Sequence, residues 1–175
     1  MASFYYACAL LQVENVNLFK SNIMDERIWI YTLSKELSNE QLVDFKNRCQ
    51  NFVSGWTAHD VSLDASFELY QNRLLIFKVN EDKYNASGCS IDKQVRFVKE
   101  LEQAFSVELL NRLLVAYENN HQVEVMKASQ VKDLLNSNTI SANTLVFDNT
   151  ITQSSELNTK WKQPLQSTWL VKYLN

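Results

Sequence analysis

The segment 87–92 (SGCSID) holds the residue types best suited to chemistry in this chain. It contains Gly88, one of only two glycines, and it precedes an apolar periodic run that predicts a helix. Free amides and the dipole at a helix start attract anions and favour the thiolate form of a cysteine. Cys89 is therefore a candidate nucleophile. The candidate ligand-binding residues are Ser87, Gly88, Ser90 and Asp92.

The same segment also fits a purely structural role, which is the more common one. Ser90 with Asp92 in the first turn is a typical helix cap. Gly88 can simply turn the chain, and Cys89 can fill a space between side chains. Both interpretations stay open.

His59 is the second candidate, because it lies just past the end of another predicted helix, in Trp56 to Asp60 (WTAHD). A histidine beside Cys89 would be the base that activates a thiol. The sequence does not say whether His59 and Cys89 meet. A histidine that interacts with the helix C-terminal dipole is the simpler interpretation.

Composition excludes several classes of function. Two glycines cannot build a Walker A loop or a dinucleotide-binding loop. The net charge of -3, with scattered Lys and Arg, argues against nucleic acid as a partner. Two histidines without a cysteine pair predict neither a metal site nor a cofactor. An odd number of cysteines, 3, favours free thiols in a reducing compartment such as the cytoplasm.

The remaining elements must position these candidates. Residues 27–33, 64–70, 73–79, 112–117 and 122–126 predict strands from their β-branched and aromatic content. Helices are predicted behind the capping box of Ser38 and Gln41 and behind Ser90. The order β-α-β-β-α-β predicts an α+β, ferredoxin-like antiparallel sheet with two helices on one face. The first and third strands should be central.

The ends of the chain are less regular. After residue 128 we expect a C-terminal α/β extension: a helix at 131–136 capped by Ser129, a strand at 144–147, and a helix at 155–162 stopped by Pro164. Residues 25–175 should form one domain. Residues 1–24 are predicted to be an extension upstream of a natural start at Met24. The apolar run 4–11 lacks the preceding basic residues of a signal peptide, and it is too short to span a membrane.

Four short motifs resemble a family of short uncharacterised bacterial proteins that often carry the automatic name "ABC transporter ATPase". These motifs are RIWIY from Arg27, W-x-x-H from Trp56 to His59, SGCSID, and W-x-x-P from Trp161 to Pro164. The resemblance covers about Arg27 to the C-terminus. It implies a bacterial cytoplasmic setting and no activity, since the chain has no Walker motifs.

Three functions are then open. The first is a non-catalytic module that binds a small anionic ligand or a protein. One face of a ferredoxin-like sheet needs a cover, which either the C-terminal third or a second copy of the chain in a homodimer would supply. The second is a small thiol-dependent enzyme that uses Cys89. The third is an adaptor beside a transporter, which only the inherited name suggests. The first requires the fewest assumptions.

Overall fold

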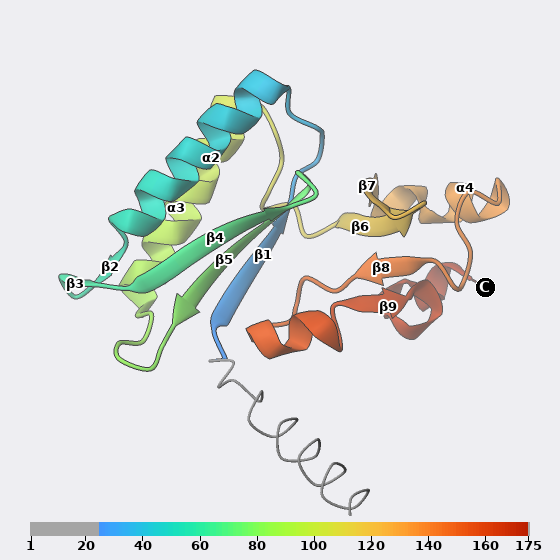
Figure 1. The fold of residues 1–175 in the computed structure, drawn as a ribbon. Coiled ribbons are helices and arrows are strands. Elements are labelled where there is room, and N and C mark those ends of the chain that lie inside the picture. Colours follow the sequence, from blue (N-terminus) through green and yellow to red (C-terminus); the bar gives the residue numbers. More distant parts are fainter. Residues whose placement is uncertain (1–24, 175) are drawn as a thin grey trace, which may run out of the picture.

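The computed structural model describes residues 25–174, which form an α+β fold built around two antiparallel sheets (Figure 1). The first sheet has three strands in the order β1-β5-β4. Its strands are β1 (Arg27–Thr32), β4 (Asp64–Tyr70) and β5 (Leu74–Asn80). Strand β5 lies in the centre and is almost entirely buried, as its continuous apolar run LLIF predicts.

Two helices cover one face of this sheet (Figure 1). They are α2 (Asn39–Ser54) and α3 (Gly88–Phe105). The capping box that the sequence predicts at the start of α2 is present, since the Ser38 hydroxyl accepts from the Gln41 amide and the Gln41 side chain accepts from the Ser38 amide. Apolar side chains of both helices pack on Phe77 of β5 and its neighbours, and this is the larger core.

A second, four-stranded sheet covers the other face. It has the order β7-β6-β8-β9, with β6 (Leu114–Asn119), β7 (Gln122–Lys127), β8 (Leu145–Phe147) and β9 (Lys162–Pro164). Ile28, Ile30 and Ile76 of the first sheet pack against Phe147 and Trp161 of this second layer. The C-terminal third therefore supplies the cover that the sequence left to an extension or to a second copy.

The prediction of an α+β fold is confirmed, but the ferredoxin-like sheet is wrong. In that arrangement the last strand, here β6, pairs with β1; instead β6 pairs with β7 and β8 in the second sheet. Strand β1 is consequently an edge strand rather than a central one. Its side chains are buried where they face the second sheet and partly buried where they face the helices.

The outer face of the second sheet carries short helical segments. They are α4 (Val131–Asn136) and the 3-10 turns Ala128–Gln130, Leu165–Ser167 and Trp169–Tyr173. The 3-10 turn Ser154–Asn158 lies instead at the start of β1, and its Leu157 packs in the core between the two sheets. Helix α4 has the predicted bounds but no side-chain cap from Ser129. The helix predicted at 155–162 is wrong: only a short 3-10 turn forms there, and Pro164 ends strand β9.

Tight hairpins connect several strands without glycine. The turns at Gln71-Asn72 and Asn120-His121 have positive φ at both positions, and so does the turn at His59-Asp60. This last turn joins β2 (Thr57–Ala58) to β3 (Val61–Ser62), a small hairpin that the sequence did not predict. Positive φ at both turn positions matches the right-handed twist of the paired strands.

Candidate functional site

The start of helix α3 is capped by Ser87 and not by Ser90 as predicted. The Ser87 hydroxyl accepts a hydrogen bond from the Ser90 amide at 3.3 Å, and Gly88 is the first helical residue. The Ser90 side chain is fully buried and donates to the Ser87 carbonyl at 2.8 Å. Two serines three residues apart can each cap a helix, and the sequence alone does not choose between them.

Gly88, Cys89 and Asp92 lie on the outer side of this helix start. The Cys89 thiol is exposed, and a Cβ added at Gly88 would meet no atom within 4 Å. Asp92 is exposed, and its carbonyl accepts a hydrogen bond from Arg96 at 3.4 Å. The helix start is thus open to water, but Ser87, Gly88, Cys89 and Ser90 line none of the three main cavities in residues 25–174.

His59 occupies the exposed β2-β3 turn, a few residues past the end of α2. The neighbouring residues do reach helix α3. The Trp56 indole donates to the Ser90 carbonyl at 2.8 Å, and Lys93 donates to the Thr57 hydroxyl at 3.0 Å. Among the described residues no hydrogen bond joins His59 to Cys89, and no cluster of three or more metal-ligating side chains forms.

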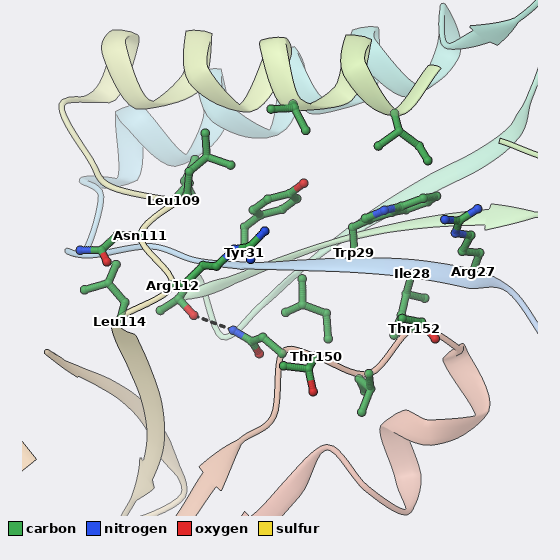
Figure 2. A pocket seen from close by; sticks show the side chains of 17 residues that line it. Arg27, Ile28, Trp29, Tyr31, Leu109, Asn111, Arg112, Leu114, Thr150 and Thr152 are labelled. Atoms are coloured by element: carbon green, nitrogen blue, oxygen red, sulfur yellow. Dashed lines mark hydrogen bonds between the residues drawn. The ribbon is translucent and has the colours of Figure 1, made fainter. Parts of the chain in front are cut away.

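The largest of the three cavities lies along the free edge of strand β1. It measures about 680 Å³, within the usual range for ligand sites. Figure 2 shows β1 crossing the cavity, with helix α3 on one side and the segment 149–152 on the other. Ile91 and Val95 of α3 and residues 109–112 complete the lining. This is the strip of β1 that the predicted fourth strand would have covered.

Both ends of the free edge are closed by main-chain hydrogen bonds. At its start, the Ile28 amide donates to the Thr152 carbonyl at 2.9 Å, and the Ser154 amide donates to the Glu26 carbonyl at 2.8 Å. At its end, the Ser34 amide donates to the Glu108 carbonyl at 3.0 Å.

Between these two closures the edge is open. Amides in a strand alternate in direction, and the Leu33 amide points into the sheet, where it donates to Arg73 at 2.8 Å. The amides and carbonyls of Ile30 and Thr32 therefore point into the cavity. No residue within 25–174 is hydrogen-bonded to them.

The two walls of the cavity differ in character. Trp29 and Tyr31 belong to the core beneath the helices, and Figure 2 shows both side chains on the α3 side of β1. Burial raises the pKa of Tyr31 to about 12, so its hydroxyl is protonated at neutral pH and donates to Gln94 at 3.2 Å. On the opposite wall, Asn149 donates to the Thr32 hydroxyl at 2.7 Å. One wall is therefore mainly aromatic and aliphatic, and the other presents amide and hydroxyl groups.

No family model matches the chain, and it matches neither a curated protein nor a solved structure. The resemblance through the SGCSID motif therefore stays a prediction. Within residues 25–174, no helix combines the length and apolarity that crossing a bilayer requires.

Proposed function

We propose that this protein is a non-catalytic interaction module that binds an extended peptide by adding it as a strand to the free edge of β1. The observation that carries this proposal is the pair of unbonded main-chain sites at Ile30 and Thr32, which face a cavity of about 680 Å³. An unpaired sheet edge is a template for another strand, and natural proteins usually block such edges. Here the edge is blocked only at its two ends.

The length of the open edge sets the length of the ligand. Strand β1 has 6 residues, and the closures at Ile28 and Ser34 leave the stretch between them free. At roughly 3.3 Å per residue, a segment of about five residues spans it. Main-chain hydrogen bonds would provide affinity, and alternate side chains would enter the two walls. Apolar residues suit the α3 wall, and small polar ones suit the wall at Asn149 and Thr150.

Filling the cavity tests the proposal. Thr152 is exposed, lines the cavity and makes no side-chain hydrogen bond within residues 25–174, so Thr152→Trp fills the groove without removing a side-chain hydrogen bond. Ser62→Trp puts the same ring on an exposed position of β3, outside the cavity. We expect a displayed library of random heptapeptides to yield sequences that bind the native protein and Ser62→Trp, with at least about tenfold weaker binding to Thr152→Trp.

Two results would count against this function. A library that yields no binder sensitive to Thr152→Trp would leave the edge without a ligand. A dimer that dissociates in Thr152→Trp, seen by light scattering, would identify a second copy of the chain as the occupant. N-methylation of the selected peptides at alternate residues tests whether they bind as a strand. Only every second amide of a bound strand faces β1, so methylating that set should abolish binding and methylating the other set should not.

A thiol-dependent enzyme is the second candidate, and the exposure of Cys89 is the observation that favours it. Cys49 and Cys89 are both free, which supports a reducing, cytoplasmic location as part of this proposal. None of the three cavities described above adjoins Cys89, so a substrate site there has less support than the edge of β1.

A further inference from the structure

The lining of the β1 cavity is cationic although the chain as a whole is acidic. Arg27 and Arg112 line it, and the described lining includes no Asp or Glu, while the net charge of the chain is -3. An arginine in a groove whose own lining holds no acidic side chain favours an anionic ligand group, because a carboxylate can accept two parallel hydrogen bonds from its guanidinium.

The two arginines differ in how they are engaged. Arg27 forms an ion pair with Glu81 at 3.4 Å and stacks over the Trp29 ring at 4.9 Å. Arg112 is exposed and forms no ion pair or hydrogen bond within residues 25–174. Figure 2 shows its side chain reaching from the segment 109–112 towards Tyr31. Its charge acts to lower the pKa of Tyr31, against the larger effect of burial. Arg112 is therefore the cation available to a ligand.

Arg112 lies at the end of the groove where strand pairing must stop. Past Thr32, the Ser34 amide is bonded to the Glu108 carbonyl and the Glu108 amide to the Ser34 hydroxyl at 2.9 Å. A bound strand cannot continue along β1 beyond this point. A chain end placed here meets a guanidinium, which attracts a carboxyl terminus and repels an amino terminus.

We infer that the groove binds the carboxyl-terminal segment of a partner protein, with the terminal carboxylate on Arg112. This inference rests on the proposed strand addition. It also fixes the direction of the ligand: its carboxyl end lies at Thr32, so it runs parallel to β1. The bound segment then pairs with Ile30 and Thr32 while its last residue neutralises the free cation.

Two versions of one random heptapeptide library test the inference with the full chain. The first displays the peptides with a free carboxyl terminus, and the second continues the chain through a fixed neutral linker. We expect the first to yield binders and the second to yield none. Selected peptides made as C-terminal amides should bind about tenfold or more weakly than the free acids.

Variants of the protein separate charge from folding. Arg112→Gln should weaken binding of the free acids about tenfold and leave the weak binding of the amides unchanged. Lys99→Gln is the matched control: it removes one positive charge at an exposed position of α3 outside the cavity and should bind as the native protein does.

The outcomes distinguish the two proposals. Binders from both libraries that are sensitive to Thr152→Trp but not to Arg112→Gln would overturn the carboxylate inference and leave strand addition standing. Absence of binders from both libraries would overturn both.

Discussion

The amide of Ile28 donates a hydrogen bond of 2.9 Å to the carbonyl of Thr152, and this contact closes the β1 edge immediately before its open stretch. A residue of the C-terminal third thus substitutes for one position of a fourth strand. The next outward-facing residues, Ile30 and Thr32, have no such substitute within residues 25–174. Residues that pair next to an open stretch hold that stretch straight, so the edge is presented as a strand before any ligand arrives.

The cysteines should differ strongly in reactivity. Burial raises the pKa of the Cys49 thiol to about 12, whereas Cys89 is exposed at the start of α3. The thiolate is the reactive form, so at neutral pH Cys89 should be alkylated by iodoacetamide much faster than Cys49. Mass spectrometry of proteolytic peptides measures each site separately. Equal, slow modification of both sites would argue against the thiol-enzyme alternative and against an accessible Cys89.

Removing the Trp56 indole N–H should destabilise the contact between the end of α2 and the start of α3. Trp56→Phe loses the 2.8 Å bond to Ser90 and part of a buried ring, which should lower the free energy of unfolding by about 1–3 kcal/mol. Trp169 is 50% exposed, so Trp169→Phe should cost less than about 0.5 kcal/mol. Urea titration of both variants checks this, and equal costs would contradict the burial of Trp56.

The cap of α3 can be assigned by mutation. Ser87→Ala removes the hydroxyl that accepts from the Ser90 amide and should lower the free energy of unfolding by about 1 kcal/mol. Ser62→Ala, on the exposed side of β3, should change it by less than about 0.5 kcal/mol. A Ser87→Ala variant as stable as Ser62→Ala would show that Ser87 is not the cap.

Stability should fall on the alkaline side. Burial, followed by its hydrogen bond to Glu124, raises the pKa of Tyr117 from 10.0 to about 12. The folded state therefore binds the phenolic proton more tightly than the unfolded state, so stability is full below pH 10 and is lost as the pH rises towards about 12. Tyr117→Phe should show a shallower decline over this range in urea titrations. An unchanged slope would mean that Tyr117 is not linked to folding.

Local features of the sequence determined several elements correctly. The capping box of Ser38 and Gln41 involves residues three apart, and its geometry depends on little else. The hairpin at Gln71-Asn72 likewise follows from turn chemistry between two strand-like runs. The prediction that Ser90 caps α3 was wrong. Ser87 and Ser90 are both serines at a helix start, so local sequence fits either as the cap, and only the burial of Ser90 decides between them.

The free edge of β1 could not be predicted from the same signals. The apolar pattern of residues 27–33 reports that both faces of the strand are covered, but it says nothing about the lateral neighbour. Strand β6 is apolar whether it pairs with β1 or with β8, since it is buried in either place. The position of Arg112 in the cavity could not be predicted from the sequence either, because single arginines before strands are common and do not indicate a binding site. Long-range pairing, not composition, creates the candidate site.

Amide hydrogen exchange of the free full-length protein, followed by NMR at single residues, tests the open edge most directly. Trp29 and Tyr31 are paired with β5, and Ile28 is bonded to Thr152, so these amides should be protected. The amides of Ile30 and Thr32 should exchange much faster than these neighbours, and they should become protected when a selected carboxyl-terminal peptide binds. Protection of Ile30 and Thr32 in the free protein equal to that of Trp29 and Tyr31 would contradict the account, because it would mean that the edge is already covered.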